Sequence, residues 1–83
     1  MPETRLREAT LKTVGAKQTL KALQTGRVMV LFVAHDADER VTAELTRLAA
    51  EAGVDRVVVP SMRELGKACG IDVGAAAAAT LKA

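Results

Sequence analysis

The sequence holds few of the residues on which small enzymes and single-strand-binding modules depend. It has one cysteine (Cys69), one histidine (His35) and one aromatic residue (Phe32), with no tryptophan or tyrosine. A single cysteine allows no intrachain disulfide, which favours a reducing compartment. Because Phe32 lies in the most apolar run of the chain, no aromatic side chain is left on which single-stranded bases could stack.

Membrane and export signals are missing as well. The longest strongly apolar run, residues 28–34, is too short to span a bilayer. The first ten residues are charged and contain no apolar signal segment. With 49% hydrophobic and 27% charged residues over 83 positions, the composition is typical of a globular protein. We therefore expect one small cytoplasmic domain over residues 1–83, with no membrane partner.

Charge is unevenly distributed along the chain, although the net charge is only +2. Residues 1–25 carry five basic against two acidic side chains, and residues 36–55 carry six acidic against two basic ones. Residues 56–83 return to a net positive charge. The pattern indicates a polarised surface with a polyanion on one side only. Ordinary solvated faces explain the same pattern about equally well.

Strand and helix patterns alternate along the sequence. In chain order we expect a short helix from Pro2, a strand at 12–14, a helix from Gly15 to Gly26, a strand at 28–34, a helix from Asp36 or Asp38 to Gly53, a strand at 57–59 and a helix at 62–69 capped by Ser61. The two valine-rich strands are expected to be buried on both faces. The alternation predicts an α/β layered sandwich with a mixed sheet.

The last segment, residues 74–81, is ambiguous because it contains a run of five alanines. Alanine has the best intrinsic helix propensity, so the residues alone favour a helix. A strand of such small residues would instead allow helices to pack closely on both sides of a sheet.

His35, Asp36 and Cys69 are the candidates for catalysis or metal binding. One histidine with Asp36 and Asp38 at a strand end is far from a complete ligand set, and an aspartate there is more often a helix cap. Cys69 has no cysteine or histidine partner nearby in sequence and is expected to pack as a small apolar residue. No G-x-G-x-x-G motif is present. The case for an enzyme is weak, and no cofactor or metal is expected.

Two segments are candidates for a binding surface. Lys17, Gln18 and Lys21 share one sector of the predicted helix, next to the free backbone amides of its first turn. Farther along, Ile71 and Val73 stand between glycines in an apolar loop. Each segment also has an ordinary explanation: a solvated helix face for the first, and side chains that turn inward beside a strand for the second.

At these segments the chain resembles the L7Ae/L30e family of ribosomal and ribonucleoprotein proteins. It is most similar to the short bacterial members, the YbxF-type kink-turn RNA-binding proteins. Residues 14–23 resemble the family's helix-start motif, and residues 34–38 resemble its strand-end pattern. Residues 65–75 resemble the loop after its fourth helix and carry the most specific similarity.

The resemblance implies a three-layer α/β/α sandwich with a mixed, mostly four-stranded sheet, in which the alanine segment is a strand. It also implies a non-enzymatic monomer, ribosome-associated, that binds the kink-turn, a bent RNA helix with a bulge and tandem sheared G·A pairs. The residues that would face the G·A pairs are Gly15, Ala16, Lys17, Gln18 and Lys21. The residues that would cover the bulged nucleotides are Lys67, Cys69, Gly70, Ile71, Asp72 and Val73. Lys17 and Gln18 stand where archaeal members have Asn and Glu, so the hydrogen bonds to base edges are expected to differ.

Two other functions stay open at this point. The first is a structural or protein-interaction subunit that uses the loop from Gly70 to Gly74 as a hydrophobic contact. The second is a small metal- or thiol-dependent enzyme that uses His35, Asp36 or Cys69. Nuclease-sensitive co-purification with RNA would distinguish RNA binding from the first, and activity lost on His35→Ala or Cys69→Ala would support the second.

Overall fold

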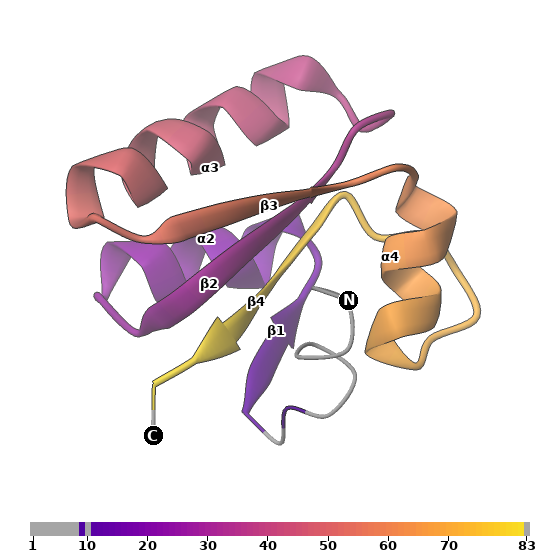
Figure 1. Ribbon diagram of the computed structural model, residues 1–83, viewed down its shortest axis with the longest axis horizontal. Coiled ribbons are helices and arrows are strands. Elements are labelled where there is room, and N and C mark those ends of the chain that lie inside the picture. Colours follow the sequence, from indigo (N-terminus) through magenta and orange to yellow (C-terminus); the bar gives the residue numbers. More distant parts are fainter. Residues whose placement is uncertain (1–8, 10, 83) are drawn as a thin grey trace.

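The computed structural model describes residue 9 and residues 11–82 (Figure 1). The helix expected from Pro2 lies outside these residues. The elements are β1 (Lys12–Val14), α2 (Ala16–Gln24), β2 (Val28–Ala34), α3 (Glu39–Ala52), β3 (Asp55–Val59), α4 (Met62–Cys69) and β4 (Ala77–Leu81). No helix in the described part of the chain is long and apolar enough to cross a membrane.

The strands form one mixed sheet in the order β1-β4-β2-β3. Strand β2 is parallel to β3, whereas β4 runs antiparallel to both β1 and β2. The alanine segment is therefore a strand, as the family resemblance implies. Ala77, Ala78 and Ala79 are fully buried in the middle of the sheet, where small side chains leave room for helices on both faces. Tertiary packing here overrides the helix propensity of alanine.

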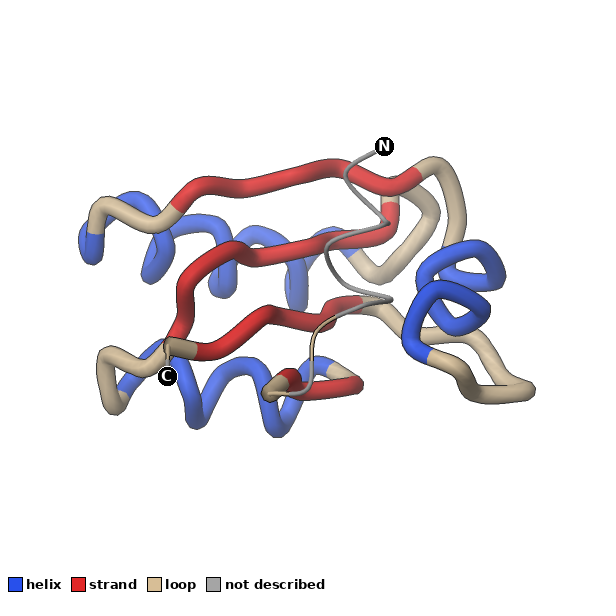
Figure 2. Tube along the Cα trace, turned by 60° about the horizontal axis from the view of Figure 1, so that its bottom comes forward, coloured by secondary structure: helices blue, strands red, loops and turns tan. Residues whose placement is uncertain are grey.

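Helices cover both faces of the sheet, which confirms the three-layer arrangement. Alternate residues of β2 point to opposite faces: Phe32 packs with Leu65 of α4, and Leu31 packs with Leu23 of α2 and Leu45 of α3. Helices α2 and α3 thus share one face, while α4 lies on the other (Figure 2). Figure 1 places α4 at the end of the sheet where β2 and β3 finish and β4 begins.

The prediction that residues 57–59 form a strand buried on both faces is wrong. Strand β3 lies at the edge of the sheet, and Val58 keeps 47% of its surface exposed while Val59 is fully buried. In β2 the same prediction fails only at Met29, which is 54% exposed. The register with β4 shifts between Val28 and Val30, so Met29 occupies a β-bulge that turns it outward.

Candidate functional site

The start of α2 is fixed by residues on both of its sides. Gly15 has a φ of 98° and a ψ of 154°, a conformation that only glycine adopts without strain. Its N–H donates to the Ala77 carbonyl over 2.8 Å, which ties the helix start to β4. The hydroxyls of Thr13 and Thr19 form a buried hydrogen bond of 2.7 Å that fastens α2 to β1. Hydrogen bonds to β1 and β4 thus hold the first turn of α2 in place.

The outer side of this first turn carries basic and amide side chains. Among the described residues, no side chain caps α2 and no acidic residue lies in its first turn. Lys17, Gln18 and Lys21 are all exposed, as predicted. Gln18 Oε1 accepts only a long hydrogen bond of 3.5 Å from Val14 N–H, so its NH2 group can donate elsewhere. Lysine charges, an amide and first-turn backbone N–H groups together make a surface suited to an anion with hydrogen-bond acceptors.

Helix α4 and the loop after it, residues 70–74, form the second part of the site. Ser61 caps the helix, with its Oγ accepting from Glu64 N–H at 3.1 Å. Gly70 ends it in the left-handed region, with a φ of 80°. The chain then turns back along the helix.

The loop lies directly against α4 because of a glycine in the helix. A Cβ at Gly66 would collide with the Val73 carbonyl, so only glycine allows the backbone to pass this closely. Ile71 N–H donates to the Gly66 carbonyl over 3.0 Å, and Ala75 N–H donates to the Met62 carbonyl over 3.0 Å. The loop is therefore pinned to the helix at both ends.

Ile71 and Val73 point to different surroundings. Ile71 is half-buried against the core around Phe32 and Leu65, whereas Val73 keeps 69% of its surface exposed. Ile71 therefore anchors the loop, and Val73 presents apolar surface to the solvent. Lys67, Gly70 and Asp72 are also exposed.

Cys69 lies inside the core and not on the surface. Its side chain is 6% exposed, and burial raises the pKa of its thiol, an effect that the charge of Lys12 partly opposes. The expectation that Cys69 packs as a small apolar residue is therefore confirmed. Any contribution of Cys69 to the surface comes through the backbone and through its support of the loop.

The structure joins the start of α2 to the loop through the first residues of β4. Gly74 is followed by Ala75 and Ala76, and then by Ala77, whose carbonyl accepts the N–H of Gly15. The end of β2 lies beside them, since Ala34 N–H donates to the Ala76 carbonyl over 2.9 Å. Two segments separated by about fifty residues in sequence thus lie at the same end of the sheet.

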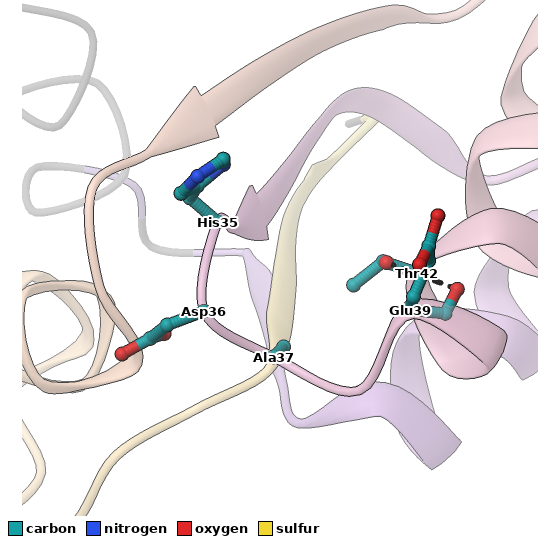
Figure 3. A pocket seen from close by; sticks show the side chains of 5 residues that line it. All are labelled: His35, Asp36, Ala37, Glu39 and Thr42. Atoms are coloured by element: carbon teal, nitrogen blue, oxygen red, sulfur yellow. Dashed lines mark hydrogen bonds between the residues drawn. The ribbon is translucent and has the colours of Figure 1, made fainter.

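A hollow of about 440 Å³ at the end of β2 adds a feature that we did not predict from the sequence (Figure 3). The residues that line it are His35, Asp36, Ala37, Glu39 and Thr42. Its sequence signal is the strand-end motif at residues 34–38, which by itself does not indicate a hollow. The volume falls in the range of small-ligand sites.

Of the two aspartates expected to cap the helix after β2, Asp38 does so, whereas Asp36 bonds to the start of α4. Asp38 Oδ1 accepts from Arg40 N–H over 2.9 Å, and the hydrogen bond with the Arg40 side chain lowers the pKa of Asp38. Asp36 Oδ1 accepts from Met62 N–H over 2.8 Å. In Figure 3, Asp36 points toward α4 and His35 points in a different direction. No group of three metal-ligating side chains occurs within residues 9 and 11–82.

Comparison with known proteins places the chain among homologues. It matches the ribosomal protein L7Ae/L30e/S12e/Gadd45 family over residues 4–83. A Bacillus pumilus protein called RNA-binding protein is 57% identical over 68 residues, covering 82% of this chain and 83% of the relative. RNA-binding protein YbxF of Geobacillus stearothermophilus is 48% identical over 69 residues, covering 83% and 84% of the two chains.

The fold has relatives among solved structures as well. The Giardia lamblia 15.5kD RNA binding protein superimposes with a TM-score of 0.85 at 26% identity, covering 98% of this chain and 68% of the other. The match to the family extends over nearly the whole sequence and includes both segments of the candidate site. This chain therefore belongs to the ribosomal protein L7Ae/L30e/S12e/Gadd45 family.

Proposed function

We propose that this protein binds structured RNA at kink-turns and stabilises their bent form without catalysing a reaction. The observation that carries the proposal is the lysine-bearing start of α2, which has no side-chain cap among the described residues and lies at the same end of the sheet as the loop of residues 70–74. Names of relatives add support, because the Bacillus, Geobacillus and Giardia proteins are all called RNA-binding.

In this proposal the start of α2 faces the sheared G·A pairs. Lys17 and Lys21 neutralise phosphates or donate to guanine acceptors, and the Gln18 amide donates to a base edge. Gly15 and Ala16 add small backbone surface that an RNA strand can approach closely. Gln18 stands where archaeal members have a glutamate, so it loses a charge but keeps an acceptor. Lys17 replaces an asparagine and strengthens the electrostatic part.

The loop covers the bulged nucleotides. Val73 supplies exposed apolar surface for an unstacked base, while Lys67, Gly70 and Asp72 present polar groups and backbone around it. Because binding favours only the bent RNA, the protein shifts the RNA toward that form by differential affinity.

A gel-shift experiment tests this function. A kink-turn RNA is compared with the same RNA whose G·A pairs are replaced by Watson–Crick pairs, and we expect binding to the first only. Lys17→Ala and Lys21→Ala should each weaken binding and lower the salt slope by roughly one phosphate-equivalent. Lys82→Ala, an exposed lysine at the other end of the sheet, is the matched control.

Equal affinity for the two RNAs would indicate only a generic basic surface and would refute kink-turn recognition.

We extend the proposal to a cytoplasmic monomer that acts on ribosomal or riboswitch-like RNA. Crosslinking in cells, followed by sequencing of the bound RNA, tests that extension. The competing protein-docking function uses the exposed Val73, and co-purification of a protein that survives nuclease treatment would favour it.

A further inference from the structure

Asp36 lies two residues after the end of β2, yet its carboxylate binds the first residue of α4. Asp36 Oδ1 accepts the N–H of Met62 over 2.8 Å. We propose that Asp36 is a positioning residue for the loop of residues 70–74, because it holds Met62, the residue to which the end of the loop is hydrogen-bonded. Its effect on RNA affinity rests on the proposed function, since the loop is one of the two segments assigned to RNA.

Met62 contacts the loop through both its backbone and its side chain. The Met62 carbonyl accepts the N–H of Ala75 over 3.0 Å. A Cβ built on Gly74 would lie 3.1 Å from Met62 Cβ, so the backbone of Gly74 packs against this residue. One residue thus receives the Asp36 hydrogen bond and carries the end of the loop.

The ordinary cap of α4 does not replace this interaction. Ser61 Oγ accepts the N–H of Glu64, two residues beyond Met62. Asp38, two residues after Asp36, bonds to Arg40 in its own helix and connects no separate element. Asp36 alone of these three side chains joins two distant parts of the chain. A carboxylate repels phosphate, so the hydrogen bond to Met62 explains Asp36 better than contact with an RNA phosphate does.

The test compares Asp36→Ala with Asp36→Asn, because both remove the same charge and only Asn keeps an acceptor oxygen. The first readout needs no RNA: amide hydrogen exchange of the folded protein under native conditions. We expect Asp36→Ala to speed exchange at Ala75 by roughly tenfold beyond any change in global stability, as for the loss of one hydrogen-bonded anchor. Asp36→Asn should stay close to wild type, and Ile71, which bonds to Gly66 at the other end, should change little in either variant.

Ser61→Ala is the matched control, since it removes a cap from the same helix without touching Met62 N–H. If Asp36→Ala and Ser61→Ala speed exchange at Ala75 equally, the loss of any cap of α4 is enough to loosen the loop, and the positioning role of Asp36 is wrong. If Asp36→Ala leaves Ala75 at the wild-type rate, the role is also wrong.

The second readout is affinity for a kink-turn RNA. Asp36→Ala should bind roughly fivefold more weakly despite losing a negative charge, as the loss of one hydrogen bond implies. Asp36→Asn should bind at least as tightly as wild type. Equal strengthening in both variants would mean that charge alone matters and would overturn the proposal. If exchange depends on Asp36 while even the wild type binds no kink-turn RNA, the proposed function fails and the positioning of the loop stands.

Discussion

The three helices of the described chain begin in different ways. Helix α3 starts with the Asp38 carboxylate on its Arg40 amide, and α4 starts with the Ser61 hydroxyl on its Glu64 amide. Both have an acidic residue in the first turn. Helix α2 starts with Gly15, carries no acid there and presents Lys17 instead. In α3 and α4 a capping side chain pairs with one first-turn amide, whereas in α2 no side chain of the described residues does so.

The uncapped start has only a small cost in stability. Glycine at an N-cap is less favourable than serine or aspartate by only a few tenths of a kcal/mol. The buried hydrogen bond between Thr13 and Thr19 and the bond from Gly15 to Ala77 hold α2 without help from a cap. A helix start without a side-chain cap can therefore still hold a fixed position, as the proposed RNA-binding surface requires.

Gly66→Ala should have the largest effect, because a side chain at this position prevents the loop of residues 70–74 from packing against α4. Propensity alone would favour Ala in the middle of α4 by about 1 kcal/mol. The collision with the Val73 carbonyl should reverse this and destabilise the protein by about 2 kcal/mol. Urea unfolding measures the stability, and RNA affinity should fall as the loop is displaced. A variant as stable as wild type would mean that the loop does not need this contact.

Lys17→Glu converts the start of α2 into one that resembles α3 and α4. An acid in the first turn should stabilise the helix by about 0.5 kcal/mol through the helix dipole. The same change should weaken RNA binding by roughly tenfold or more, because it replaces attraction to phosphate by repulsion. Thermal unfolding should therefore show a more stable protein, and a gel shift should show weaker RNA binding. If stability and RNA affinity both increase, the helix start does not face RNA.

Ile71→Ala and Val73→Ala separate the two apolar residues of the loop. Ile71 packs against the core, so its truncation should cost about 1–2 kcal/mol of stability. Val73 is 69% exposed, so its truncation should change stability by less than about 0.5 kcal/mol. RNA affinity should nevertheless fall several-fold in Val73→Ala. Urea unfolding and gel shifts on both variants check this, and unchanged RNA affinity in Val73→Ala would remove that residue from the interface.

The sequence is most informative where local chemistry determines structure. The caps at Asp38 and Ser61, the strand at 12–14 and the exposed Lys17-Gln18-Lys21 sector could all be predicted from neighbouring residues. The alanine strand could not, because its state depends on its central place in the sheet. The edge position of β3, which exposes Val58, depends equally on strand order.

The site was predictable in its segments but not in its assembly. No residue pattern indicates that the Val73 carbonyl lies on Gly66, or that Ile71 turns inward while Val73 turns outward. The hydrogen bond between Asp36 and Met62 connects the segment after β2 to the start of α4 across a long stretch of sequence, so no local spacing predicts it. The hollow at His35 likewise forms only when β2 and α3 are in place.

Mapping RNA contacts on the isotopically labelled protein by NMR tests the central claim most directly. On titration with a kink-turn RNA, we expect the largest amide shifts in residues 15–21 and 67–75. Gly26 and Gly53, which follow α2 and α3 at the opposite end of the sheet, should change little. Shifts concentrated around Gly26 and Gly53, with the start of α2 unperturbed, would contradict the account.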